Sequence, residues 1–245
     1  MFEEYNSLLV ILFSSCFITA AISAIIGMAG GVALLGVMTF FYPHNIIVPL
    51  HGLAQLISNG SRTLLLLKNV YWPIVAWYAA AIPFGAIISY FLIKEINHPE
   101  KFQILIAFLI FYVVFKPKKL PNLKLKNYQF LFVGFFDGII APLIGASGPL
   151  KAVFFVRDDF TKEEIVSTKA CTQILSHLIK MPIFIALAFP FMNYIKEIST
   201  MAVGVLMGTY IGVKILHKVN QKIFMLLFKS ALILAALRIL YKNLL

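Results

Sequence analysis

Apolar residues fill this chain in long segments that only short polar turns interrupt. Three such segments, residues 7–27, 46–67 and 71–93, each hold more than 20 residues. A helix rises about 1.5 Å per residue, so each of these segments can cross a hydrocarbon core of about 30 Å. Residues 30–42 would make a helix of only about 20 Å, so we expect this segment to begin or end within the membrane. The pattern predicts a bundle of membrane-spanning helices in which one helix is broken.

The same order of segments returns in the second part of the chain. An apolar segment, residues 102–115, ends the first part, and a basic linker of residues 116–127 follows with five lysines and two prolines. We therefore divide the chain into a first transmembrane repeat (1–115), the linker (116–127) and a second transmembrane repeat (128–245). The five segments of the second repeat are residues 128–145, 148–156, 163–187, 198–216 and 223–241.

The duplication is also visible at single positions, because two stretches align without a gap at an offset of 118 residues. The glycine-rich segment 27–31 then falls on 145–149, and three polar positions coincide inside apolar segments. Polar residues are costly in such segments, so their coincidence indicates a true repeat. The matched polar pairs are Gln55 with Gln173, Ser58 with Ser176, and Arg62 with Lys180.

The number of crossings in each repeat decides how the repeats are oriented. Two repeats of five crossings each would be inverted relative to each other in the membrane. With both chain ends outside, this arrangement places ten basic residues inside and four outside, whereas four crossings per repeat divide the same residues eight to six. Cytoplasmic loops are rich in lysine and arginine, so five crossings are favoured. We expect an all-α polytopic membrane protein of two inverted repeats, each with about five helical segments and a half-helix at its glycine-rich motif.

The composition supports a multi-pass protein of the cell membrane and excludes other classes. Hydrophobic residues make up 61% of the chain, charged residues only 13%, and the mean hydropathy is +0.92. Soluble domains of this size are much more polar. The net charge of +11 does not indicate nucleic-acid binding, because the lysines lie in short loops between apolar segments. Cys16 and Cys171 fall within apolar helices, where packing is the usual role of cysteine.

Polar residues form a narrow stripe on the third segment of each repeat. Successive helix residues advance by about 100°, so the stripe positions of a segment lie within about 60° of one another. Hydrogen-bond donors and cations cannot face lipid, so we expect each stripe to face the bundle interior or a water-filled cavity. The first stripe consists of His51, Gln55, Ser58 and Arg62, and the second consists of Lys169, Gln173, Ser176 and Lys180 with His177 beside them.

The glycine breaks add a second feature that suits an anion. A half-helix that begins at Gly30 or Gly148 directs its free backbone N–H groups and the positive end of its dipole into the protein. Glycine at these positions, and at Gly31, lets a ligand approach the backbone closely. The third segment of each repeat runs back through the membrane, so its polar stripe lies at the same depth as the glycine break. Each repeat therefore supplies one half of a predicted anion pocket. Ser147 of the second break completes the predicted substrate contacts.

Each of these residues also has a structural interpretation. Glycines in membrane helices often serve close helix packing, and Arg62 and Lys180 near helix ends could extend to the interface. The two stripe histidines could be structural donors. Asp137, in the middle of an apolar segment, is expected either to pair with a cation such as Lys151 or Lys169 or to belong to a proton path. The sequence leaves both interpretations of Asp137 open.

At these residues the sequence resembles the sulfite exporter TauE/SafE family, also called the toluene-sulfonate uptake permease group. The similarity rests on the break at 27–31, on Gln55 and Ser58, on the basic turn 68–72 and on the motif 83–86, and it covers nearly the whole chain. It implies a secondary transporter of small sulfur-containing anions such as sulfite or sulfonates, with alternating access around a midplane site. Two features depart from the family pattern: the second break has fewer glycines, and Lys169 replaces a residue that is more usually neutral.

Other functions fit parts of the sequence. The segment 145–148 with the later His177 resembles the serine motif of rhomboid intramembrane proteases, but this interpretation leaves the first repeat unexplained. A passive anion channel or a membrane assembly partner would need no active coupling. The sequence contains no metal cluster, Walker A loop or nucleotide motif, so we expect no cofactor, no metal and no enzymatic activity. The expected partners are a small anion, the lipid bilayer and a proton as the candidate coupling ion.

Overall fold

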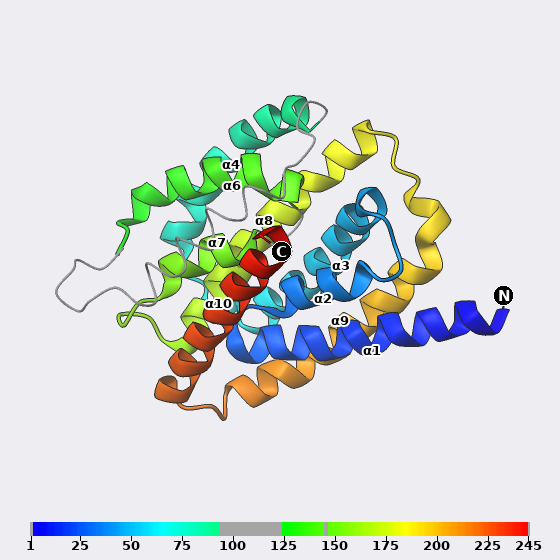
Figure 1. Cartoon of the computed structure of the whole chain (residues 1–245). Coiled ribbons are helices and arrows are strands. Elements are labelled where there is room, and N and C mark those ends of the chain that lie inside the picture. The colour runs from blue at the N-terminus through cyan, green and yellow to red at the C-terminus, as the bar shows by residue number, and fades with distance from the viewer. Residues whose placement is uncertain (1, 94–123, 145–146, 245) are drawn as a thin grey trace.

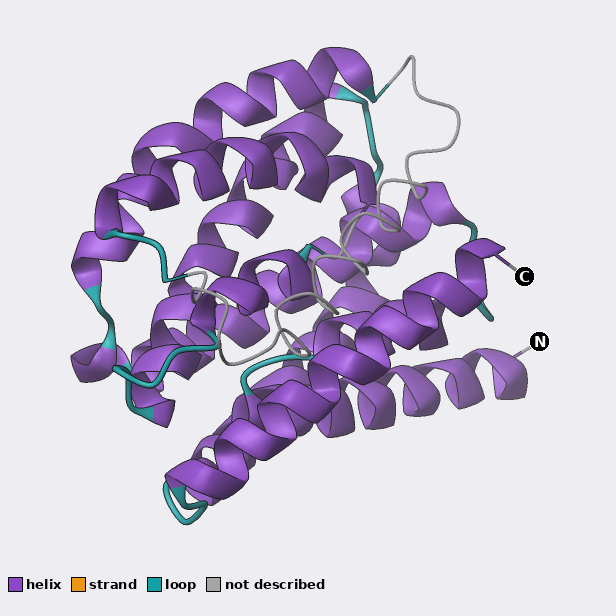
Figure 2. Cartoon of the chain, turned by 60° about the vertical axis from the view of Figure 1, so that its left-hand side comes forward, coloured by secondary structure: helices purple, strands orange, loops and turns teal. Residues whose placement is uncertain are grey.

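The described part of the chain folds into helices alone. The computed structural model describes residues 2–93, 124–144 and 147–244, and it contains no strand within them (Figure 2). The predicted helix 102–115, the turn before it and most of the linker lie outside the described residues. The nine α-helices of the described residues are α1 (Phe2–Ile26), α2 (Gly30–Met38), α3 (His44–Leu65), α4 (Trp72–Leu92), α6 (Phe130–Ile144), α7 (Gly148–Ala152), α8 (Lys162–Ala186), α9 (Ile195–Leu216) and α10 (Gln221–Leu244).

Short helices follow the predicted breaks. α1 ends just before Gly27 and α2 starts at Gly30, while α7 starts at Gly148. Gly27 and Ala29 both have a positive φ, of 83° and 73°, which turns the chain sharply between α1 and α2. Glycine adopts such a φ readily, whereas Ala29 is held there under strain. α2 has only nine residues, so the prediction of a short, broken helix after the first crossing is confirmed.

The helices form three tiers, with the polar helices in the middle. α1 packs along α9 on one side, and α4 packs along α6 on the other (Figure 1). Between these pairs α3 contacts α8, and α3 also contacts α9 while α8 contacts α4. The first helix of each repeat thus packs on the fourth helix of the other repeat. The contacts α1 with α9 and α6 with α4 are therefore of the same kind with the two repeats exchanged. The inverted orientation of the repeats in the membrane stays a prediction.

Glycines allow the outer helix pairs to approach closely. A side-chain carbon at Gly208 of α9 would lie 2.1 Å from the backbone oxygen of Phe17, and one at Gly85 of α4 would lie 2.0 Å from that of Phe135. Both distances are too short for any side chain, so small residues are required at these crossings. Phe17 and Phe135 are separated by 118 positions, the offset of the duplication. Phe17 and Phe135 thus occupy matching positions of the duplication, whereas Gly208 and Gly85 do not, since the offset pairs them with Tyr90 and Val203.

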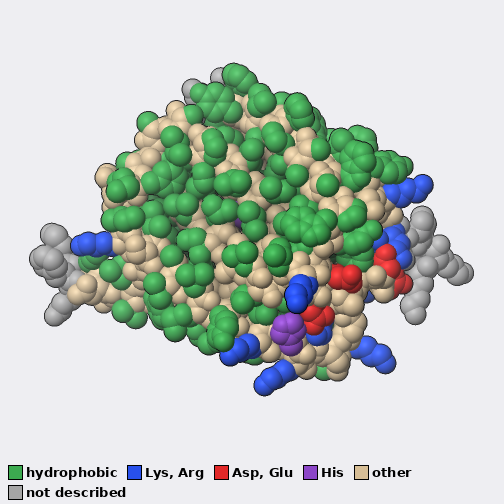
Figure 3. Space-filling model, turned by 180° about the vertical axis from the view of Figure 1, so that it is seen from behind, with side chains coloured by type: hydrophobic (Ala, Val, Ile, Leu, Met, Phe, Trp, Pro, Cys, Tyr) green, Lys and Arg blue, Asp and Glu red, His purple; other side chains and the backbone are tan. Residues whose placement is uncertain are grey.

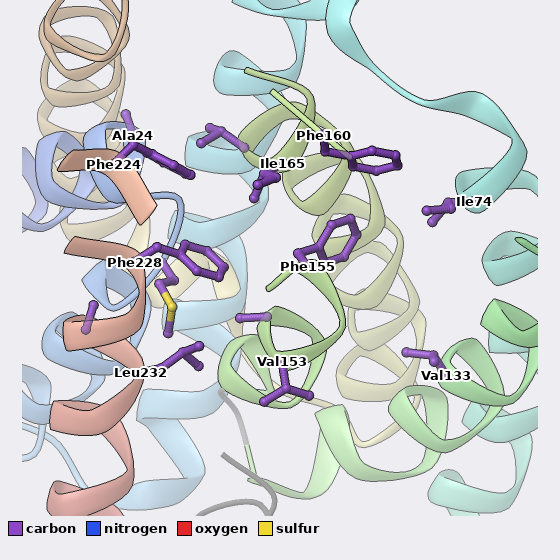
Figure 4. Packing of buried hydrophobic residues seen from close by; sticks show 14 of the residues in the cluster. Ala24, Ile74, Val133, Val153, Phe155, Phe160, Ile165, Phe224, Phe228 and Leu232 are labelled. Carbon is purple, nitrogen blue, oxygen red and sulfur yellow. The ribbon is translucent and has the colours of Figure 1, made fainter. Parts of the chain in front are cut away.

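The largest apolar core joins α10 to the rest of the bundle. Phe224, Phe228 and Leu232 are spaced one turn apart and point to the same side of α10 (Figure 4). They are buried in one cluster with Val153 and Phe155, which follow α7. Lipid is as apolar as these side chains, so close packing and not exclusion of water holds α10 in place.

The surface of the bundle suits a lipid environment. In the described part of the chain, three helical segments are long and apolar enough to span a membrane: Tyr5–Ile26, Trp72–Leu92 and Phe191–Leu216. Figure 3 shows a face covered largely by apolar side chains, with most of the charged side chains toward its lower right. α3 and α8 have comparable lengths but carry the polar stripes, and they lie between the other helices. These features are those of a multi-pass membrane protein.

Four connecting segments meet at one end of the bundle. They precede α4, α6, α8 and α10. A polar contact joins the segment before α6 to the segment before α4 and to the segment before α8, and another joins the starts of α8 and α10. At the other end, the rings of Tyr42 and Tyr194 meet at 6.4 Å between centroids. Five crossings per repeat require this grouping, whereas four crossings would place the segments before α6 and α8 on opposite sides of the membrane. The contacts at the first end are Asn127 with Tyr71 (3.3 Å), Lys124 with Asp158 (3.3 Å) and Lys162 with Gln221 (2.8 Å).

Side-chain hydrogen bonds fix the connection before α8, residues 157–161. Arg157 donates two hydrogen bonds to the carboxylate of Asp159, at 2.9 and 2.7 Å. These bonds lower the pKa of Asp159 to about 2, so this ion pair persists at physiological pH. Thr161 and Glu164 then form a capping box, in which each side chain accepts from the backbone N–H of the other residue. The start of α8, the helix that carries the second stripe, is therefore well defined.

The end of the bundle with the charged connections is expected to face the cytoplasm. Single cysteines at Lys218 and Asn193, both exposed, should therefore react with a membrane-impermeant maleimide from opposite sides of the membrane in intact cells. Cys16 and Cys171 are buried, so the parent chain provides a low background. Labelling of both positions from the same side would contradict five crossings per repeat.

Candidate functional site

A small cavity lies where the break between α1 and α2 meets α3, α7 and α8. We call it the central cavity. Its volume is about 20 Å³, which holds a water-sized group and little more. The lining comes mainly from the glycine breaks and the polar stripes. The residues that line it are Ser23, Met28, Ala29, Gly31, Val32, His51, Gln55, Gly148, Pro149, Lys169, Gln173 and His177.

Both repeats contribute to the central cavity. The first repeat brings predicted substrate contacts from α2 and α3, and the second brings them from α7 and α8. The structure thus brings together residues that the sequence places far apart, while their role in binding stays a prediction. The predicted contacts found here are Gly31, His51, Gln55, Gly148, Lys169, Gln173 and His177.

The two matched glutamines lie against the two breaks. A side-chain carbon at Gly31 would be 3.0 Å from Gln55 Oε1, and one at Gly148 would be 2.9 Å from Gln173 Nε2. Glycine at these two positions therefore leaves room for an amide group beside the backbone. The matched glutamines therefore place one amide group at each break, on the lining of the central cavity.

Lys169 joins the second repeat to the break of the first. Its ammonium donates to the carbonyl of Gly27 at 2.9 Å and to Gln173 Oε1 at 3.0 Å, and only 1% of the residue is exposed. An ammonium has three donors, so these two bonds leave capacity for another acceptor. Both acceptors are neutral, so neither cancels the buried charge.

Two buried histidines lie side by side at the central cavity. The ring centroids of His51 and His177 are 6.1 Å apart, and the ring planes are inclined by 71°. His51 Nε2 lies 2.8 Å from the carbonyl oxygen of Gly31. A carbonyl can only accept, so Nε2 carries the proton of this tautomer. In the described part of the chain, Nδ1 of each histidine has no hydrogen-bond partner.

The other predicted contacts lie outside the central cavity. Gly30 serves helix packing, since a side-chain carbon there would be 1.9 Å from the backbone oxygen of Thr19. Arg62 is fully buried and donates to Asn59 at 3.4 Å and to Ser58 at 3.3 Å. Lys180 is fully buried as well, so the interpretation that these two cations extend to the interface is wrong. The remaining members of this group are Ser58, Ser147 and Ser176, all buried.

Asp137 lies at the centre of a buried polar cluster. It forms an ion pair with Lys151, at 3.0 Å between Nζ and Oδ2. Ser176 donates to the same carboxylate oxygen at 2.5 Å, and the Tyr78 hydroxyl also donates to it. Four helices, α4, α6, α7 and α8, therefore meet at one carboxylate. The sequence suggested Lys151 or Lys169 as the partner of Asp137, and the salt bridge is made with Lys151. We call Tyr78, Asp137, Lys151 and Ser176 the ion-pair cluster.

A comparison with models of protein families matches residues 12–239 to the family described as sulfite exporter TauE/SafE. The match spans nearly the whole chain. The chain belongs to the TauE/SafE family. Members of the TauE/SafE family are membrane transporters and not enzymes, which excludes the protease alternative. Comparisons with curated proteins and with solved structures each gave no match.

This TauE/SafE protein buries more basic than acidic side chains. Lys151 neutralises Asp137, and Glu197 lies in the first turn of α9, near the end that carries Tyr194. Of the other buried basic residues, Lys169 lines the central cavity, and Arg62 and Lys180 lie further along the two polar stripes. In the described residues, the buried cations are Arg62, Lys151, Lys169 and Lys180, and the buried carboxylates are Asp137 and Glu197.

Tyr78 and Ser23 are the polar residues of this region that sequence reasoning missed. Tyr78 is completely buried in α4 and donates to Asp137 within the ion-pair cluster, while Ser23 lines the central cavity from α1. A hydroxyl in the middle of an apolar helix was the available signal at both positions. Across residues 2–93, 124–144 and 147–244, no three His, Cys, Asp or Glu side chains are grouped as a metal site requires.

Proposed function

We propose that this TauE/SafE transporter moves a small sulfur-containing anion, such as sulfite or a sulfonate, across the cell membrane through the central cavity. The observation that carries the proposal is the cavity itself, which both repeats line with amide, imidazole and ammonium groups. Family membership implies an anionic substrate such as sulfite. The direction implied by the family is export.

The lining is suited to an oxyanion. Lys169 supplies a full charge, and a charge acts more strongly in the low dielectric of the interior than in water. Gln55 and Gln173 each offer amide N–H donors. The N-terminus of α2 adds partial positive charge next to Gly31. An anion bound there would meet donors from both repeats.

The small volume of the central cavity suits a closed step of the transport cycle. About 10–15 Å³ on this measure holds one water molecule, so the cavity has room for little more than one, and a larger oxyanion needs the lining to move apart. The site is formed by α2 and α3 of one repeat and α7 and α8 of the other, and motion of one group against the other would open it. We propose alternating access on this basis.

A proton is the proposed coupling ion, and Asp137 remains our coupling candidate. Its support is its position, since it is a buried carboxylate tied to α7 through Lys151. Protonation of Asp137 would weaken the ion pair and loosen the tie between α7 and its neighbours. The same contacts also give Asp137 a structural role.

Sulfite or a sulfonate should stabilise the purified protein in a panel that also contains sulfate, thiosulfate and carboxylates. A ligand that binds only the folded state stabilises it by about 2.7 kcal/mol at a hundred times its dissociation constant. The measurement is the melting temperature in detergent at constant ionic strength, with chloride as the reference. A panel without any anion-specific shift would contradict the proposal. In proteoliposomes, flux that never exceeds the substrate gradient would instead support the passive channel.

A further inference from the structure

We infer that the central cavity takes up its anion together with one proton, which Nδ1 of His51 receives. This inference rests on the proposed function, since it requires an anion in the cavity. It adds the protonation step that accompanies binding, and it assigns that step to a residue of the first repeat.

The bond to Gly31 determines which nitrogen of His51 can receive a proton. The carbonyl oxygen lies 2.8 Å from Nε2 and can only accept, so Nε2 holds the N–H. Nδ1 is left with a lone pair. This nitrogen is buried without a hydrogen-bond partner, and the residue is only 1% exposed. His51 lines the cavity, and its one free ring nitrogen can accept a proton but not donate one.

An anion in the central cavity must come close to this ring. The volume of about 20 Å³ leaves little space away from His51, which lines the cavity with His177 and both glutamines. Anion oxygens and Nδ1 both carry lone pairs, so they repel each other unless a proton lies between them. A proton on Nδ1 turns the ring into a cationic donor, and such charge-assisted hydrogen bonds are among the strongest in proteins.

The groups around His51 favour this linkage. α8 presents His177, Lys169 and Lys180, all of them donors or cations, while α1 and α2 contribute only neutral lining such as Ser23 and the Gly31 carbonyl. Arg62 lies on α3 itself, three turns further along. Among the described residues, the one salt bridge of a histidine is that of His217 with Glu163, so no carboxylate pairs with His51. A charge on His51 is therefore compensated only when an anion enters, and each ligand strengthens the binding of the other.

The step balances in atoms and charge. One proton joins Nδ1, one monoanion enters the cavity, and the net charge of the site is unchanged. The proton comes either from water or from a protonated anion such as hydrogen sulfite. Methanesulfonate separates these sources, because it has no titratable proton near neutral pH and any proton uptake must then involve the protein.

The test is calorimetric binding of methanesulfonate to the intact protein in two buffers that differ in ionisation enthalpy. We expect uptake of one proton per anion, and an affinity that falls about tenfold per pH unit as the pH rises across about 5.5 to 8. Binding without proton uptake would overturn the inference and leave the anion site in place. Absence of binding by methanesulfonate, sulfite and the other anions would overturn both.

Variants assign the proton to His51. In His51→Gln the amide nitrogen can still donate to Gly31, but the side chain cannot titrate, so proton uptake and the pH dependence of affinity should disappear. His217→Gln, at an exposed position between α9 and α10, is the matched control and should keep both. Loss of proton uptake in His177→Gln with retention in His51→Gln would overturn the assignment. The melting temperature of each variant verifies folding, and the wild-type measurement decides the linkage even if one variant does not fold.

Discussion

Replacement of Lys151 by methionine should destabilise the folded protein by about 3–5 kcal/mol, because it leaves Asp137 as a buried carboxylate without its cation. Lys151 and Asp137 are 1% and 0% exposed, so water cannot take over the role of the ammonium. Methionine keeps an unbranched apolar stem, and the substitution therefore isolates the loss of charge. The measurement is unfolding in detergent micelles, followed by circular dichroism.

Two further variants make this result specific. The double variant Lys151→Met with Asp137→Asn removes both charges and should recover much of the lost stability. Lys222→Met, on an exposed position of α10, should change the stability by no more than about 0.5 kcal/mol. If Lys151→Met were as stable as the wild type, the ion-pair cluster would not be structural. The coupling role of Asp137 would then be examined through loss of pH-gradient-driven transport in Asp137→Asn.

Anion binding should weaken at least tenfold in Lys169→Gln. Loss of a charged hydrogen-bond partner from a buried site typically costs about 1.5–3 kcal/mol, which is about tenfold to more than a hundredfold in affinity. Glutamine retains an N–H donor for the Gly27 carbonyl, so the break between α1 and α2 keeps a partner. The readout is the dissociation constant of methanesulfonate, with Lys222→Gln as the control for a general loss of positive charge.

The matched glutamines then tell whether the site is shared between the repeats. Gln55→Ala and Gln173→Ala should each weaken binding, since both amides lie at the central cavity. Normal binding by the Lys169 and Gln173 variants, with failure of the Gln55 variant, would show that the second repeat is only a scaffold.

The helix order and the breaks follow from short-range patterns, which is why the sequence reveals them. The segment after Gly30 is too short to cross a membrane, and α2 is correspondingly short. The offset of 118 residues predicts that the two stripes are equivalent, and α3 and α8 indeed contact each other. In each case length or periodicity along a single helix contains the information.

The contacts of individual polar residues depend on packing between distant helices, and helix periodicity does not contain them. The angular position of Arg62 is the same as that of Gln55 within about 20°, yet Arg62 bonds within the bundle and does not line the cavity. The ion-pair cluster needs Tyr78 from α4 and Lys151 from the five-residue α7, where no periodicity can be recognised. Such convergence is a property of the tertiary structure.

The crossing of α1 on α9 also determines the order in which the protein can be completed during synthesis. Helices insert first and associate afterwards, so α1 enters the membrane long before the Gly208 surface on which Phe17 packs has been made. Within the span Tyr5–Ile26, an 18-residue window has a mean hydropathy of 2.5, which suits a helix that must remain stable alone in lipid. α6, in contrast, finds α4 already in place. The first repeat alone is therefore an unfinished assembly, and release from the translocation machinery before α9 would leave α1 without its partner.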